Sequence, residues 1–139
     1  MENNITFLMM CQHKLIIGKL NKILDGFGMD KNDLLDMIGS FKKDLLEHMA
    51  LEEKVIFSFP DLGGDDVKQD IVKLLSDHNE IRRALENFQN LEEGGMSDFN
   101  KLLARHESLE TGIFYPKLDR ELDQEKKEKI INDISTKRC

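Results

Sequence analysis

The chain contains the same short pattern twice, and its residue types are those that bind metal ions. The segments HMALEEKVIF and HESLETGIFY each place a glutamate four residues after a histidine, with a leucine directly before the glutamate. The first pair is His48 and Glu52, and the second is His106 and Glu110. Residues four apart on a helix lie one above the other on the same face. Each pattern therefore points an imidazole and a carboxylate into one layer of a helical protein.

The two remaining histidines, His13 and His78, also fall among regularly spaced apolar residues. Core positions of packed helices recur at alternating steps of three and four residues. Four such tracks contain every histidine and the glutamates of both pairs, whereas the neighbouring Glu53 and Glu107 fall off them. The predicted core tracks are Met9, His13, Ile16, Leu20, Ile23 and Phe27; Leu34, Ile38, Phe41, Leu45, His48, Glu52, Val55 and Phe59; Val67, Ile71, Leu74, His78, Ile81, Leu85 and Phe88; and Phe99, Leu103, His106, Glu110 and Ile113.

These buried polar groups need a common partner. An unpaired ionised carboxylate in an apolar interior costs on the order of several kcal/mol or more. A single core histidine would be explained by ordinary hydrogen bonding, but two buried carboxylates would not. No lysine or arginine occupies the four tracks. The pattern therefore predicts that one cation or two bind between the helices.

The number and type of the donor groups indicate which metal would bind. Four imidazoles and two carboxylates are nitrogen and oxygen donors without a thiolate. Structural zinc takes four ligands and often cysteine, while calcium and magnesium prefer oxygen. Ferritin-type di-iron bundles use a Glu-x-x-His spacing and more carboxylates than histidines. Two iron ions, or manganese, bridged by the two carboxylates therefore fit best.

Turn-forming clusters divide the chain into four longer segments with helical periodicity. Glycine gathers with aspartate, asparagine, serine or proline at residues 25–33, 60–66 and 92–98. Because short connections favour antiparallel neighbours, we expect an all-α protein that forms an up-down-up-down antiparallel four-helix bundle.

Capping signals and the end of the chain add detail to this expectation. Asp66 with Gln69 predicts a capping box at one helix start, and Ser97 or Asp98 predicts a cap at the next. The charged segment at about 117–137 carries spaced leucine and isoleucine residues. It predicts a short C-terminal helical extension, for which packing on the outside of the bundle is favoured over a partner-binding surface.

Composition excludes several classes of function. The chain has 139 residues, 40% of them hydrophobic and 34% charged, which is typical of one helical domain. Its net charge of -7 argues against nucleic acid or an anionic membrane as a partner. No apolar run approaches the ~20 residues that span a bilayer, and no basic leader opens the sequence. Cys11 and Cys139 are expected to be reduced thiols without a predicted role, in a cytoplasmic protein.

The order His, His-x-x-x-Glu, His, His-x-x-x-Glu, with one element on each helix, resembles the hemerythrin-like (HHE cation-binding) family. The resemblance covers about residues 5–118 of a single domain at 1–139, with 119–139 as the extension. It implies two iron ions joined by an oxo or hydroxo bridge, with Glu52 and Glu110 as the bridging carboxylates. The ligands it implies are His13, His48, Glu52, His78, His106 and Glu110.

The chain departs from the oxygen-carrying members of that family at two places. Those members have two histidines four residues apart on the third helix, whereas His78 has Leu74 four residues before it and Arg82 four after it. Their last ligand is an aspartate five residues after a histidine, where this chain has Glu110 at four. One additional iron position is therefore expected to be open. It would hold water, which is favoured, or one of Glu47, Glu53 and Tyr115.

The resemblance implies a non-haem di-iron protein that binds dioxygen or nitric oxide for storage, delivery, sensing or detoxification. One alternative is an enzyme that acts on peroxide or nitric oxide, or that donates iron for cluster repair. Another is a module that binds a separate protein partner in response to iron or oxygen. A binding protein is favoured over an enzyme, because imidazole-rich ligation keeps the charge of the centre low.

Overall fold

The computed structural model describes residues 4–26, 30–88 and 93–134, and these residues are mainly helical. No strand occurs among them, so the prediction of an all-helical protein is confirmed. The predicted core residue Phe27, and Cys139, lie outside the described residues. The helices are α1 (Ile5–Asp25), α2 (Lys31–Leu51), α3 (Asp65–Glu86), α4 (Glu93–Leu109), α5 (Tyr115–Glu121) and α6 (Gln124–Ile134), and the π-helices are η1 (Glu52–Phe57) and η3 (Glu110–Phe114).

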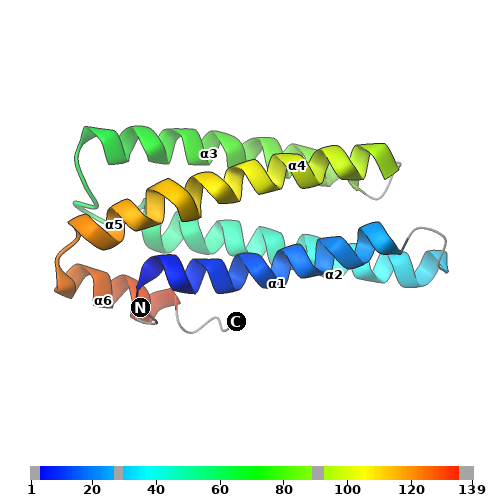
Figure 1. Cartoon of the computed structure of the whole chain (residues 1–139), viewed down its shortest axis with the longest axis horizontal. Helices are drawn as coiled ribbons and strands as arrows, with labels where there is room; N and C mark the ends of the chain where they lie inside the picture. The colour runs from blue at the N-terminus through cyan, green and yellow to red at the C-terminus, as the bar shows by residue number, and fades with distance from the viewer. Residues whose placement is uncertain (1–3, 27–29, 89–92, 135–139) are drawn as a thin grey trace.

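The long helices α1, α2, α3 and α4 lie side by side along the long axis of the molecule (Figure 1). Helix α1 packs against α2 and α4, and α3 packs against α4 and α2. Helix α5 continues the line of α4 beyond η3, and α6 turns back beside the start of α1 (Figure 1). None of the described helices is both long and apolar enough to cross a membrane.

Side-chain caps begin the first two helices. The Asn4 side chain accepts a hydrogen bond from the backbone N–H of Phe7 at 2.7 Å. Asp30 accepts hydrogen bonds from the backbone N–H groups of Asn32 and Asp33. Such caps satisfy N–H groups that have no partner inside the helix.

The capping predictions for the next two helices are wrong. Helix α3 begins at Asp65, and its N-cap is Gly64, which has no side chain to accept a hydrogen bond. Asp66 therefore lies inside the first turn, where a carboxylate is favoured by the helix dipole and where it pairs with Lys117 at 3.3 Å. Helix α4 begins at Glu93, so Ser97 and Asp98 lie within the helix rather than before it.

The predicted C-terminal helix packs against the body of the protein. Ile130 and Ile134 of α6 are fully buried, and α6 contacts α1 and η1. Asp119 of α5 accepts hydrogen bonds from the backbone N–H groups of Ile5 and Thr6 at 2.9 and 3.0 Å. The extension therefore closes the N-terminal end of α1.

Two apolar cores lie on either side of one polar layer, which consists of His13, His48, Glu52, His78, His106 and Glu110. Along each of the four long helices, the chain passes from one core through this layer into the other. The first core includes Ile16, Leu45, Ile81, Phe99 and Leu103. The second core includes Met9, Ile56, Leu74, Phe114 and Leu118.

The π-helices displace the predicted core tracks by one residue. Val55 was expected in the core, but Ile56 is the fully buried residue and Val55 is half-buried. Ile113 was expected there too, but it is 52% exposed and Phe114 is buried instead. A π-turn contains about one residue more than an α-turn, so the residue that returns to the core face comes one position later than α-helical spacing predicts.

The loop before α3 offers a test of the packing. A Cβ atom added to Gly63 would lie 2.5 Å from Cγ2 and 2.8 Å from Cβ of the buried Val67, a stiff β-branched side chain. We expect Gly63→Ala to lower the free energy of unfolding by about 1–3 kcal/mol. Gly39→Ala, which has open space inside α2, should raise it by about 0.5–1 kcal/mol. Urea unfolding of both variants measures the difference, and equal stabilities would contradict the contact.

Candidate metal centre

The polar layer forms two overlapping groups of possible metal ligands. Within each group, one nitrogen or oxygen atom of every residue lies within 4.8 Å of those of the others. The first group is His13, His48, Glu52 and Glu110, and the second is Glu52, His78, His106 and Glu110. The structure thus brings together all six residues that the sequence singles out. Both groups contain the same two glutamates.

The histidine Nε2 atoms point toward these glutamates. His13 Nε2 lies 3.1 Å from Glu110 Oε1, and His106 Nε2 lies 3.2 Å from Glu110 Oε2. His78 Nε2 lies 3.0 Å from Glu52 Oε1, and His48 Nε2 lies 3.5 Å from the same oxygen. Each carboxylate is therefore next to two imidazoles that come from different helices.

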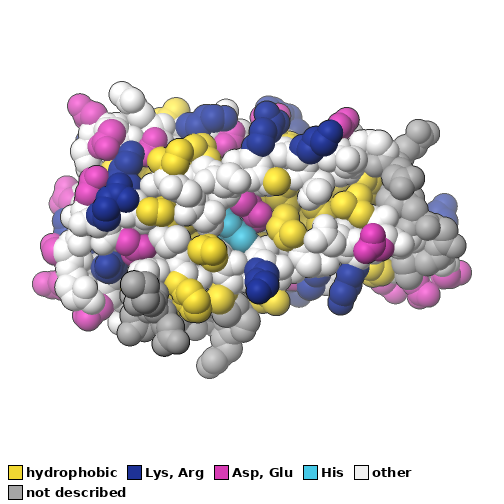
Figure 2. Space-filling view, viewed as in Figure 1, with side chains coloured by type: hydrophobic (Ala, Val, Ile, Leu, Met, Phe, Trp, Pro, Cys, Tyr) yellow, Lys and Arg dark blue, Asp and Glu magenta, His cyan; other side chains and the backbone are white. Residues whose placement is uncertain are grey.

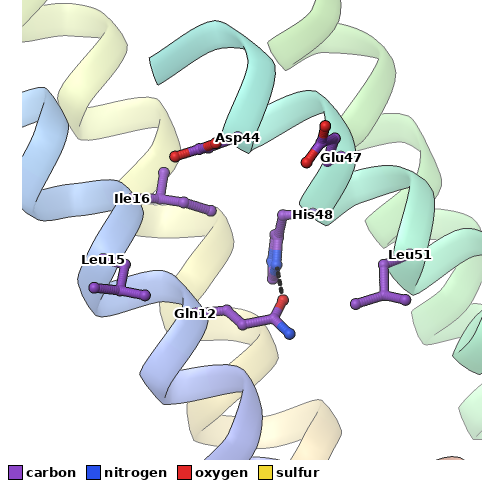
Figure 3. Close-up of a pocket in the computed structure, with 7 residues that line it drawn as sticks. All are labelled: Gln12, Leu15, Ile16, Asp44, Glu47, His48 and Leu51. Atoms are coloured by element: carbon purple, nitrogen blue, oxygen red, sulfur yellow. Dashed lines mark hydrogen bonds between the residues drawn. The ribbon is translucent and has the colours of Figure 1, made fainter. Parts of the chain in front are cut away.

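The outer Nδ1 atom of each imidazole faces a side-chain acceptor from a neighbouring helix. We call these four residues the outer acceptors: Gln12 for His48 at 2.7 Å, Glu53 for His78 at 2.7 Å, Asp77 for His106 at 3.1 Å, and Glu107 for His13 at 3.8 Å. Figure 3 shows the first of these contacts as a dashed line.

The outer acceptors determine which ring nitrogen is free for a ligand. Carboxylate and amide oxygens only accept hydrogen bonds, so an Nδ1 atom in contact with one carries the proton. The Nε2 lone pair is then directed into the polar layer, as in histidines that bind metals. In chain order, an acceptor on α1 holds the histidine of α2, one on η1 holds the histidine of α3, and one on α3 holds the histidine of α4. The acceptor on α4 lies beside the histidine of α1.

Sequence reasoning missed these supporting roles. Gln12 and Asp77 were not singled out, and Glu53 and Glu107 were expected off the core tracks, although Glu107 is only 9% exposed. Each of the four stands next to a polar-layer residue in the sequence. That adjacency is the available signal, but it hides the role because each acceptor serves a histidine on a different helix.

The three candidates for an additional ligand lie at the edge of the layer or outside it. The Tyr115 hydroxyl is fully buried and donates a hydrogen bond to Glu52 Oε2. Glu53 faces the outer side of His78 and pairs with Arg82 at 2.8 Å. Glu47 is exposed. Neither Glu53 nor Glu47 belongs to either ligand group among the described residues.

The two glutamates differ in their electrostatic environment. Burial alone would raise the pKa of Glu110, but the nearby imidazoles of His106, His13 and His78 outweigh it and hold that pKa well below the usual value. Burial, together with the charge of Glu110, raises the pKa of Glu52 to about 8. Without a cation, the layer therefore favours one ionised and one neutral carboxyl group.

The pKa values of the histidines depend on these carboxylates. Burial opposes the charged form of each histidine, but the adjacent Glu110 carboxylate, 3.1 Å away, raises the pKa of His13 to about 9. The nearby carboxylates of Glu110 and Glu52 raise the pKa of His78 to about 10 against the effect of burial. Burial and the nearby charge of His13 lower the pKa of His48 to about 3. Protons thus take the place that a cation would have in this layer.

Several inward-facing atoms have no hydrogen-bond partner within the described part of the chain. They are Glu52 Oε1, His78 Nε2, His106 Nε2 and both carboxylate oxygens of Glu110. Buried polar atoms are nearly always paired, because leaving one unpaired costs about 1–3 kcal/mol. These atoms are nitrogen and oxygen donors directed at a shared space, so they fit a metal cation.

Comparison with known families agrees with this geometry. The model of the hemerythrin HHE cation-binding domain matches residues 4–118. The chain belongs to this family. The predicted resemblance is thereby confirmed, and the match ends inside α5, so α6 lies beyond it. No curated protein and no solved structure matches this hemerythrin-family chain.

Two cavities approach the polar layer of this hemerythrin domain beside α1. The smaller, of about 210 Å³, lies between α1 and α2 and is lined by Gln12, Leu51 and His48 among others (Figure 3). The larger, of about 730 Å³, lies between α1 and α4 and includes His13 and Glu107. On this face, a small exposed histidine surface borders an acidic side chain, with hydrophobic side chains nearby (Figure 2). Small molecules can thus approach the layer from α1.

The raised histidine pKa values predict how the metal-free hemerythrin domain responds to pH. Below pH 6.5, His13 and His78 are protonated in both folded and unfolded chains, so their stabilisation is complete. As pH rises toward the folded values of about 9 and 10, the unfolded chain binds fewer protons and stability falls. Glu52, raised to about 8, acts in the same direction.

Urea unfolding in the presence of a chelator should therefore give a free energy lower at pH 9 than at pH 6.5. The expected decrease is at least about 1.4 kcal/mol, the value of one unit of pKa difference. Ordinary carboxylates and lysines titrate outside this window. The metal-loaded protein is the control, because metal binding strengthens as histidines lose protons. A metal-free protein that gains stability over this range would contradict the assignment.

Proposed function

We propose that this protein is a non-haem di-iron protein that binds dioxygen or nitric oxide. Its ligands would be His13, His48, Glu52, His78, His106 and Glu110. The observation that supports this most directly is the pair of overlapping four-residue groups that share both glutamates. Two ions held by one such set would each receive two imidazoles and would share two bridging carboxylates.

The donor set supports iron over the alternatives. Neither group contains a cysteine, and imidazole donors suit iron, whereas magnesium and calcium prefer oxygen. Bound iron would supply electrons and an open coordination position for a diatomic ligand. The residues of this chain orient the imidazoles through the outer acceptors and surround the site with apolar side chains.

The predicted up-down-up-down four-helix bundle belongs to the same proposal. Each long helix ends close to the end of the molecule at which the next long helix begins (Figure 1). Each long helix contributes one histidine to the polar layer, and the two glutamates begin the π-helices that follow α2 and α4. A bundle of this kind places ligands from facing helices in its core.

A second candidate function is the enzymatic reduction of peroxide or nitric oxide. Both reactions consume protons, and Glu107 is a buried carboxyl group 3.8 Å from His13 at the wall of the larger cavity. Burial raises the pKa of Glu107 to about 7, so it can hold a proton at neutral pH. This candidate shares the metal centre with the first and differs in the fate of the ligand.

Substitution of the bridging glutamates tests the two-iron assignment. The parent protein, reconstituted with ferrous iron, should hold two irons per chain. Glu52→Gln and Glu110→Gln keep the side-chain volume but remove the anionic oxygen, so each should bind iron at least about ten-fold more weakly. Elemental analysis and circular dichroism measure the bound iron and the fold.

The control for these variants is Glu86→Gln, which removes one negative charge from an exposed position of α3. It should keep two irons. Glu53 and Glu107 are unsuitable as controls because both face histidines. A parent protein with one iron, or with a preference for zinc at saturation, would refute the dinuclear assignment.

Titration with gases separates the two candidate functions. Anaerobically reduced, iron-loaded protein should change its optical spectrum on addition of dioxygen or nitric oxide. If the protein is a carrier or sensor, the change should reverse when the gas is removed. Consumption of peroxide or nitric oxide with product formation would instead favour the enzyme. An unchanged spectrum with every ligand would contradict both functions.

A further inference from the structure

We infer that the two ion positions differ in affinity, and that the position beside His78 and His106 fills before the one beside His13 and His48. This inference rests on the proposed di-iron function. It follows from the residues around the two ligand groups, which share both glutamates and differ only in their histidines. Any difference in affinity must therefore come from the histidines and from the groups that hold them.

The first difference lies in the inward nitrogen atoms. His13 Nε2 and His48 Nε2 form a hydrogen bond with each other at 3.0 Å. His78 Nε2 and His106 Nε2 are buried without a hydrogen bond among the described residues. An ion beside α1 and α2 must separate two histidines that bond to each other, whereas an ion beside α3 and α4 meets two nitrogen atoms whose near contacts are only the shared glutamates. The position beside His78 and His106 therefore gains more free energy from binding the ion.

The second difference lies in the outer acceptors. His78 and His106 are held by carboxylates, Glu53 at 2.7 Å and Asp77 at 3.1 Å. A carboxylate that accepts the Nδ1 proton makes the imidazole a stronger donor to a metal. Arg82 and Lys73 pair with these carboxylates, but Lys73 is 63% exposed at its side chain and therefore screened by solvent.

The other two histidines have weaker support. His48 is held by the neutral amide of Gln12 at 2.7 Å. Glu107 lies 3.8 Å from His13 Nδ1, which has no hydrogen bond of its own within the described ranges. The position beside α1 and α2 therefore has one neutral acceptor and one distant acceptor.

Access from the solvent also distinguishes the two positions, and the weaker position beside α1 is the more accessible. His13 and His48 line the two cavities beside α1. His78 is fully buried, with the Phe57 ring centred 5.5 Å from its own. His106 borders a third cavity of about 340 Å³, where Asp77 covers its outer nitrogen. The ion beside α1 would thus also be the more exchangeable of the two.

Calorimetric titration of the metal-free protein with ferrous iron under anaerobic conditions tests the order of filling. The parent should bind two irons in two resolved steps, the first at least about ten-fold tighter. Asp77→Asn keeps the volume and the hydrogen-bond acceptor but removes the charge. It should weaken the first step about 10–100-fold and change the second by less than about three-fold.

A second variant strengthens the weaker position. Gln12 Nε2 is buried without a hydrogen-bond partner in the described structure, so Gln12→Glu removes an unpaired donor and places a carboxylate beside His48. This variant should tighten the second iron-binding step and so reduce the difference in affinity between the two steps. If Asp77→Asn does not fold, Gln12→Glu alone tests the order of filling. Asp36→Asn, the same chemical change at an exposed position of α2, is the control.

The outcomes distinguish this inference from the proposed function. A parent that binds two irons in one unresolved step, or an Asp77→Asn variant in which only the second step is weakened, would overturn the order of filling and leave the di-iron function intact. A parent that saturates at one iron would overturn the di-iron function itself. Two steps with the expected response of both variants would support both.

Discussion

Two fully buried carboxylates in one layer are the constraint on which the rest of this structure depends. Glu52 and Glu110 have no exposed surface, and both lie between two apolar cores. Burying even one ionised carboxylate without a partner is costly, and two of them also repel each other. The four histidines come to this layer from four different helices, and either protons on His13 and His78 or metal ions can supply the positive charge that offsets the carboxylates.

Glu52 and Glu110 also begin the two π-helices. The irregular helical turns therefore lie at the candidate metal centre, and they affect the packing there. Each π-helix starts at its glutamate, η1 at Glu52 and η3 at Glu110. Short π-helical segments are rare and often occur at functional sites. Here they delay the return of the chain to the second core by one residue, so that Ile56 and Phe114 are buried there. The second π-helix, η3, also leads directly into Tyr115, whose hydroxyl group holds Glu52 in place.

The sequence predicts a structural feature of this protein well when a single helix determines that feature, and poorly when the feature depends on how several helices pack. The six polar-layer residues were predictable because regular spacing on single helices places them among core positions. Val55 and Ile113 were misplaced because that spacing assumes an unbroken α-helix. Gln12 and Asp77 were missed because their role depends on how neighbouring helices are rotated, which no local pattern records. The capping box at Asp66 failed because the helix starts two residues earlier than predicted, with Asp66 favoured by the helix dipole inside the first turn.

The separation of the two cores gives the polar layer a structural role beyond ligand binding. The apolar residues form one cluster on each side of it, and α1, α2, α3 and α4 all cross it. Three imidazoles are held from the outside by hydrogen bonds to residues of other helices, and Glu107 faces the fourth at 3.8 Å, so the histidines connect the four helices in sequence. A cation in the layer would neutralise its charge and connect the two cores through their shared boundary. Loss of the cation would leave that boundary dependent on protons alone, and metal binding and folding are therefore expected to be coupled in this protein.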